Sequence, residues 1–199
     1  LGEAYASAEA QLQRDDIEKC MTGGAVPDIG DDQPVFLGVD IGFQCHITLS
    51  IDLPDGRPHF ILFQTIPVMH LETRIQELRD LYNIVQGASD RFPLTTTVDA
   101  LRDHTNGLIM PVQYRGTASL AALKDELGNI VHYSANRTLI LDRMLMLISN
   151  KKMVISGYTS LKETVIAHLT DMVRDEQPDV EAEWKKITGK NYRSFTGIS

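Results

Sequence analysis

Cysteine is scarce in this sequence, which holds only Cys20 and Cys45 among 199 residues and has no C-x-x-C pair. That scarcity excludes a disulfide scaffold and a cysteine-based zinc site, and it suits a reducing compartment. No apolar run approaches the roughly 18 residues of a membrane-spanning helix, and no basic segment followed by an apolar run marks a secretion signal. We therefore expect a cytoplasmic protein without a membrane partner.

Several catalytic motifs are also missing. The sequence contains no P-loop, no G-x-G-x-x-G fingerprint, no H-E-x-x-H pair and no nucleophile elbow. Basic residues are outnumbered, with 19 Lys and Arg against 27 Asp and Glu for a net charge of −8. Such a chain is not expected to hold nucleic acid tightly by itself, because phosphate contacts need local positive charge. An acidic composition is nevertheless compatible with a site built from carboxylates.

The chain divides near Pro34. Residues 4–21 carry helix formers and charge and predict a surface helix, whereas residues 22–34 are rich in Gly, Pro and Asp and predict a linker. The apolar content of 43% is typical of a folded protein. We therefore expect an N-terminal segment over residues 1–34 and one domain over residues 35–199.

Three antiparallel strands are predicted to open this domain. Residues 35–42 form a nearly continuous apolar run, as in a strand buried on both faces. Residues 46–53 alternate strictly between polar and apolar, and residues 59–68 are again apolar. Pro54-Asp55-Gly56 supplies turn chemistry between the last two strands.

Helices and further strands follow. Apolar residues at helical spacing predict a helix over 71–85 that Gly87 ends, and β-branched residues predict a strand over 94–101. The remaining predicted elements are a strand over 108–114, a hairpin over 126–134, a buried helix over 138–148, a strand over 152–156 and a helix over 161–173. This order predicts an α/β protein of the RNase H-like fold. Its central mixed sheet has three antiparallel strands, then parallel strands, and is flanked by helices.

Asp40 is the first candidate functional residue, because it is the single carboxylate in the apolar run 35–42. An ionised carboxylate inside such a strand needs compensation, and a bound Mg²⁺ or Mn²⁺ supplies it. The alternative is a structural Asp that caps a turn or pairs with an Arg.

Asp99 is the second candidate, since it lies at the end of the predicted strand 94–101. If the two strands are neighbours, Asp40 and Asp99 emerge at one edge of the sheet, where ligands of α/β proteins bind. Carboxylates there suit two-metal phosphodiester cleavage. The alternative is an Asp that caps a short helix.

Three segments give the chain its resemblance to a known family. They are V-F-L-G-V-D-I-G at 35–42, T-T-V-D-A-L at 96–101 and S-A-N-R-T-L-I-L-D-R-M at 134–144. They are similar to the C-terminal nuclease domain of the large terminase subunit of tailed bacteriophages. L-G-E-A-Y at the start of the chain is similar to the connection that follows the ATPase domain in that family.

The resemblance implies an Mg²⁺- or Mn²⁺-dependent endonuclease that cuts concatemeric double-stranded DNA in the host cytoplasm. It implies Asp40 and Asp99 as metal ligands, and it implies as partners an ATPase domain missing before Leu1, a small terminase subunit and a portal. The family's third acid usually follows a segment similar to residues 184–191, but residues 192–199 contain no carboxylate. Either the sequence diverges before that ligand, or an earlier acid such as Asp171 or Asp175 replaces it, so only Asp40 and Asp99 are carried over and the third ligand is left open.

Other functions remain open at this stage. G-V-D-I-G also resembles the first strand of Holliday-junction resolvases and the phosphate loop of actin-like or sugar-kinase-like ATP-binding proteins. The absent third acid fits a docking module that has lost its metal site. Arg102, Arg115 and Lys124 are candidates for contacts with the DNA backbone, with ordinary surface charges as the alternative.

Overall fold

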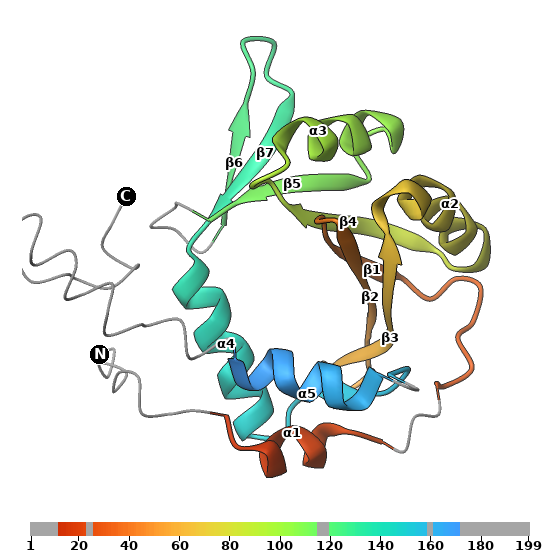
Figure 1. Cartoon of the computed structure of the whole chain (residues 1–199), viewed down its shortest axis with the longest axis vertical. Coiled ribbons are helices and arrows are strands. Elements are labelled where there is room, and N and C mark those ends of the chain that lie inside the picture. Colours follow the sequence, from red (N-terminus) through yellow and green to blue (C-terminus); the bar gives the residue numbers. More distant parts are fainter. Residues whose placement is uncertain (1–11, 23–25, 115–119, 159–160, 172–199) are drawn as a thin grey trace, which may run out of the picture.

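An eight-stranded mixed sheet forms the centre of the computed structural model, which describes residues 12–22, 26–114, 120–158 and 161–171. The strand order is β6-β7-β5-β4-β1-β2-β3-β8 (Figure 1). The strands are β1 (Val35–Asp40), β2 (Gln44–Asp52), β3 (Pro58–Pro67), β4 (Ile84–Asp90), β5 (Ile109–Gln113), β6 (Leu120–Lys124), β7 (Ile130–Ala135) and β8 (Val154–Ile155).

The three strands that open the domain form the predicted meander. β1 pairs antiparallel with β2, and β2 pairs antiparallel with β3. Burial alternates along β1 and β2, so one face of each strand lies in the core. The period-two pattern of the sequence specified β2 and the face that it buries, whereas β1, which was predicted to be buried on both faces, is fully buried on only one.

Parallel strands extend the sheet on the other side of β1. β4 pairs parallel with β1, β5 with β4, and β7 with β5. The order β3-β2-β1-β4-β5, with β1, β4 and β5 parallel, is that of the RNase H-like fold. The predicted fold class, an α/β protein with a mixed sheet flanked by helices, is confirmed.

Helices α2 (Leu71–Leu81) and α3 (Thr95–His104) contribute to the main core (Figure 1). Their buried residues join those of β1, β2 and β3 in one cluster: Leu71, Ile75 and Leu78 from α2, and Val98 and Leu101 from α3. The core residues Val39 and Ile47 belong to the same cluster. Because neighbouring strand residues point to opposite faces, Asp40 and His46 lie on the face away from this core.

A second apolar cluster joins residues 12–20 to residues 148–166. It combines α1 (Arg14–Cys20), α4 (Arg137–Ser149), β8 and α5 (Lys162–Asp171), which lie together away from α2 and α3 (Figure 1). Ile17 of α1 and Ile148 of α4 are fully buried there. The segment before residue 35 thus contributes to the packed structure of the domain.

The predicted helix over 71–85 is too long. α2 ends at Leu81, and the chain then enters β4, which the sequence analysis did not predict. Gly87 does not end a helix but lies inside β4, where a Cβ atom would meet Ile109 Cγ1 at 2.9 Å. The glycine allows β4 and β5 to pair closely at this point.

The predicted strand over 94–101 is wrong, because residues 95–104 form helix α3. Three consecutive threonines favour a strand locally. However, Val98, Leu101 and Thr105 recur at helical spacing and are all buried, and the Thr105 hydroxyl donates to the Leu101 carbonyl at 2.9 Å. Burial of this stripe outweighs the β-branched preference.

The later elements follow the prediction in outline. The hairpin of β6 and β7 begins earlier than predicted, and α4 is less buried than predicted, since Ile148 is its only buried residue. β8 and α5 lie within the predicted ranges, although Val173 lies outside the described residues. None of the helices in the described ranges has the length and apolar content needed to cross a bilayer.

Candidate active site

Asp40 and Asp90 are side-by-side carboxylates at the carboxyl edge of the sheet. β1 and β4 run parallel, and their last paired residues are Val39 and Ser89. Asp40 and Asp90 are the next residues of the two strands, and each ends its strand. Val39 and Ser89 are buried, so the alternation of the strands places both carboxylates on the face away from the main core. Asp40 is exposed and Asp90 is half-buried.

The charge of Asp40 acts on Asp90. Burial raises the pKa of Asp90 above its ordinary value, and the nearby charge of Asp40 raises it further. The amide hydrogen bond from Phe92 to Asp90 Oδ1, at 3.0 Å, and the charge of Arg137 oppose this rise in the pKa. Neither carboxylate has an ion-pair partner within 4.0 Å among the described residues.

This donor set fits a divalent cation. Two adjacent carboxylates without an ion-pair partner repel each other, and a hard cation between them removes that repulsion. Carboxylate oxygens are the ligands that Mg²⁺ and Mn²⁺ prefer. Two carboxylates are an incomplete set, however, and the described residues contain no group of three or more His, Cys, Asp or Glu side chains placed to hold a metal ion.

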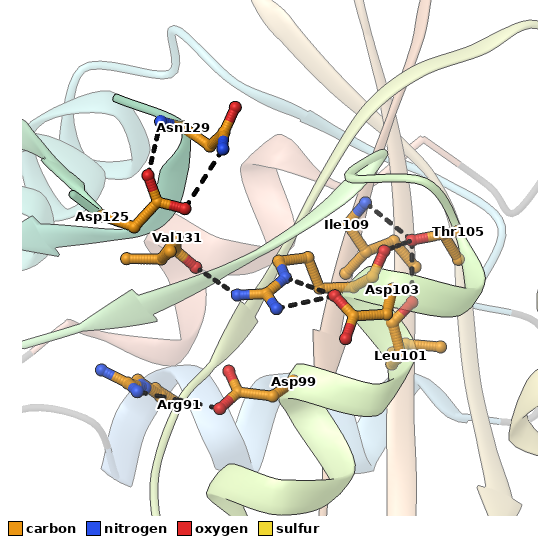
Figure 2. Close-up of polar contacts among 10 residues, drawn as sticks. Arg91, Asp99, Leu101, Asp103, Thr105, Ile109, Asp125, Asn129 and Val131 are labelled. Atoms are coloured by element: carbon orange, nitrogen blue, oxygen red, sulfur yellow. Dashed lines mark hydrogen bonds and ion pairs between the residues drawn. The ribbon is translucent and has the colours of Figure 1, made fainter. Parts of the chain in front are cut away.

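Asp99 lies elsewhere. It is on α3 and not at a strand end, so the reasoning that placed it beside Asp40 is wrong. Its Oδ2 atom is 3.7 Å from Nη2 of Arg91, and Figure 2 shows the two side chains directed toward each other. Arg91 also contacts His132, with Nη1 3.1 Å from Nδ1. The carboxylate beside Asp40 is therefore Asp90.

The sequence around Asp90 resembles the sequence around Asp40, although hydrophobic periodicity does not identify the segment as a strand. Asp90 ends the segment I-V-Q-G-A-S-D, just as Asp40 ends V-F-L-G-V-D. In both segments apolar residues are followed by a glycine and, two or three residues later, by an aspartate. Small residues at positions 87–89 weaken the apolar pattern, so the segment resembles a helix end more than a strand.

Helix α5 approaches the same region of the sheet. The ring of His168 on α5 lies edge-on to the ring of His46, with 5.4 Å between their centroids. His46 is the antiparallel partner of Asp40. Asp171 is the last residue of α5, three positions after His168. Asp175, the other third acid that the sequence suggests, lies outside the described residues.

Of the three basic residues suggested by the sequence, the structure describes Arg102 and Lys124. Arg102 donates to the Asp103 carboxylate, with Nη2–Oδ1 at 2.6 Å, and to the Val131 carbonyl at 3.0 Å, so it ties α3 to β7 (Figure 2). Lys124 is exposed on β6, and Arg115 lies outside the described residues. A basic residue near the acid pair is Arg137, the first residue of α4.

Among solved structures, those similar to this chain include terminases. A large terminase from a thermophilic bacteriophage matches 76% of this chain and 33% of its own length, at 11% identity and a TM-score of 0.47. The large terminase of bacteriophage HK97 matches 79% of this chain and 35% of its own length, at 11% identity and a TM-score of 0.49. A manganese-soaked human cytomegalovirus terminase nuclease domain matches 85% of this chain and 95% of its own length, at 10% identity and a TM-score of 0.46.

The chain therefore spans about a third of the two phage terminases, at 33% and 35% of their lengths. No family model and no curated protein matches the sequence. The terminases are the family that the sequence itself resembles.

Proposed function

We propose that this chain is the nuclease domain of a viral DNA-packaging terminase, and that it hydrolyses the phosphodiester backbone of concatemeric double-stranded DNA with Mg²⁺ or Mn²⁺. One observation carries the proposal: Asp40 and Asp90 end two adjacent parallel strands of an RNase H-like sheet. The two carboxylates lie on one face of the carboxyl edge and make no ion pair within 4.0 Å among the described residues, so they can hold cations that bind a phosphate.

In this proposal Asp40 and Asp90 hold the cations. Two carboxylates are an incomplete set, and the acids that the sequence offers as a third ligand are Asp171 and Asp175. When bound, the divalent cations would lower the pKa of an attacking water and neutralise charge on the scissile phosphate. Asp99 has no role at this centre and instead positions Arg91.

The wider assembly follows from the same proposal. Residues 35–199 are the nuclease domain, and residues 1–34 connect it to an ATPase domain that drives packaging. The small terminase subunit and the portal are the other partners, and the host cytoplasm is the site of action. Since the chain carries a net charge of −8, the ATPase motor holds the DNA, and the nuclease adds only local contacts.

A second candidate is a docking module of the same fold without catalysis. It is favoured by the absence, among the described residues, of any cluster of three metal-ligating side chains. A module of this kind would keep the fold and the acid pair but would not cleave DNA.

A plasmid-cleavage assay with Mn²⁺ separates the two candidates. We expect the wild type to nick and linearise plasmid, Asp40→Asn and Asp90→Asn to lose at least about a hundredfold in rate, and Asp99→Asn to retain activity. Undiminished cleavage by Asp40→Asn or Asp90→Asn would refute the proposed site. Binding of Mn²⁺ without cleavage would favour the docking module, and preferential cleavage of a four-way junction would indicate a resolvase.

A further inference from the structure

Arg137 lies at the same edge of the sheet as the acid pair. It is the first residue of α4 and follows β7 directly after Asn136, whose Oδ1 atom accepts a hydrogen bond from the Leu139 amide at 3.2 Å. β7, β5, β4 and β1 form a continuous parallel set. Their carboxyl ends therefore meet at one edge, where Asp40 ends β1, Asp90 ends β4, and α4 begins after β7.

The charge of Arg137 reaches this acid pair. It lowers the pKa of Asp90, in opposition to the effects of burial and of Asp40. It also lowers the pKa of Tyr114, the residue after β5, while burial and the charges of Asp90 and Asp40 raise it. The strand register and these electrostatic effects agree that Asp40, Asp90, Tyr114 and Arg137 form one cluster.

The guanidinium of Arg137 has no ion-pair partner within 4.0 Å among the described residues, and its side chain is exposed. Arg91, which follows β4 directly, and Arg102 on α3 both have carboxylate partners. Arg137 is therefore available to an anion from outside the chain.

We propose that Arg137 contacts a non-bridging oxygen of the DNA phosphate that the Asp40–Asp90 site engages, an inference that rests on the proposed nuclease function. A phosphodiester is repelled by two carboxylates, and divalent cations offset that repulsion without fixing the direction of approach. A guanidinium presents a planar fork of donors that matches two phosphate oxygens, so it orients the group as well as attracting it. The N-terminus of α4 adds positive partial charge at the same edge.

The experiment measures binding of a short DNA duplex in Ca²⁺, at several salt concentrations, alongside Mn²⁺ titration calorimetry and cleavage in Mn²⁺. The variants are Arg137→Ala, Arg137→Lys and, as a matched control, Arg143→Ala, which removes an exposed arginine farther along α4. Arg137→Ala should weaken duplex binding about fivefold to tenfold at low salt and reduce the salt-dependence slope by about 0.9, the value for one phosphate contact. Arg143→Ala should change neither.

Arg137→Lys tests orientation separately from charge. It should retain the wild-type salt dependence of duplex binding but cleave DNA at least about tenfold more slowly. The lysine ammonium attracts the phosphate but cannot make the bidentate contact of a guanidinium. Both Arg137 variants should bind Mn²⁺ at least as tightly as the wild type. Arg137→Lys keeps the positive charge near the metal site and Arg137→Ala removes it, so neither variant adds repulsion of the cation.

Two results would overturn this inference. One is an unchanged salt slope in Arg137→Ala, and the other is an equal loss in Arg137→Ala and Arg143→Ala. Either result would refute the proposed contact between Arg137 and the phosphate. If the wild type still bound Mn²⁺ and Asp40→Asn did not, the proposed function would nevertheless be retained. If the wild type bound neither Mn²⁺ nor duplex, the proposed function would fail as well.

Discussion

Asp40 and Asp90 are lateral neighbours on parallel strands, each one residue beyond the Val39–Ser89 pair. Their negative charges act on each other, and the charge of Asp40 contributes to the raised pKa of Asp90. A fold that places two carboxylates side by side without an ion pair to either of them loses stability there. This arrangement is typical of a site whose charge is balanced by a ligand.

Neutralising Asp90 should stabilise the protein when divalent ions are absent. In Asp90→Asn the repulsion from Asp40 disappears while the size of the side chain is kept. We expect a higher Tm for Asp90→Asn than for the wild type in EDTA, measured by differential scanning calorimetry. With Mn²⁺ at a hundred times its Kd the order should reverse, because binding adds about 2.7 kcal/mol to the wild type alone.

Asp99→Asn is the control for this prediction. It weakens the Asp99–Arg91 ion pair and should lower the Tm slightly, with the Mn²⁺-induced rise unchanged. If Asp99→Asn abolished the Mn²⁺ effect and Asp90→Asn did not, the metal site would lie on α3 and not at the strand ends.

His59 should make the fold sensitive to mild acid. Its buried ring is 2.8 Å from Ser156 Oγ, measured from Nε2, and burial lowers its pKa, with a smaller contribution from Arg57. A histidine in the unfolded chain takes up a proton near pH ~6.5, whereas folded His59 resists protonation. Stability should therefore be complete above that pH and fall as the pH decreases through the lowered pKa of folded His59.

Urea unfolding between neutral and mildly acidic pH measures this effect. His59→Gln cannot titrate and should show a flatter pH dependence than the wild type. His104→Gln, a substitution of an exposed histidine, should follow the wild-type curve. Parallel curves for His59→Gln and the wild type would show that the proton is not taken up at His59.

Gly87→Ala should destabilise the sheet. The new methyl group would lie 2.9 Å from Ile109 Cγ1 and 3.4 Å from Leu37 Cβ, both in the buried core. Overpacking of this kind costs about 1–3 kcal/mol, measurable by denaturant unfolding. Gly30→Ala is the control, because nothing lies within 4 Å of a Cβ atom at that position. Equal stabilities of the two variants would contradict the close approach of β4 and β5.

Ile17→Ala should show whether the N-terminal segment is part of the folded unit. Ile17 on α1 is fully buried against α4 and α5, so its truncation should cost about 2–5 kcal/mol in the free energy of unfolding. Arg14→Ala removes the exposed ion pair with Glu163, 2.7 Å from Nη2 to Oε1, and should have a much smaller effect. If Ile17→Ala left the free energy of unfolding unchanged, residues 1–34 would behave as a linker.

The antiparallel half of the fold was predictable because its signals are local. In β2 every second residue is buried, and the sequence itself alternates there between polar and apolar residues, whereas the β1 segment is a nearly continuous apolar run. Asp40 was predictable for the same reason, since a lone carboxylate in an apolar run is conspicuous.

β4 and α3 were not predictable in this way. The segment that forms β4 ends in small residues with weak strand preference, and it becomes a strand because β1 and β5 pair with it on both sides. The threonine-rich segment becomes α3 because Val98 and Leu101 reach the core only as a helix. Because of these two errors, the sequence analysis predicted that Asp99 ends the strand beside β1, a position that Asp90 occupies in the structure.

The sequence by itself determined the fold class, the opening meander and one acid of the candidate site, because hydrophobic periodicity within a strand acts over a few residues. Only the tertiary structure decided which carboxylate stands beside Asp40 and which arginine joins it. Asp90 and Arg137 are 50 and 97 positions away from Asp40 along the chain. Parallel pairing of β1, β4, β5 and β7 brings their carboxyl ends to one edge, and no local pattern encodes that register.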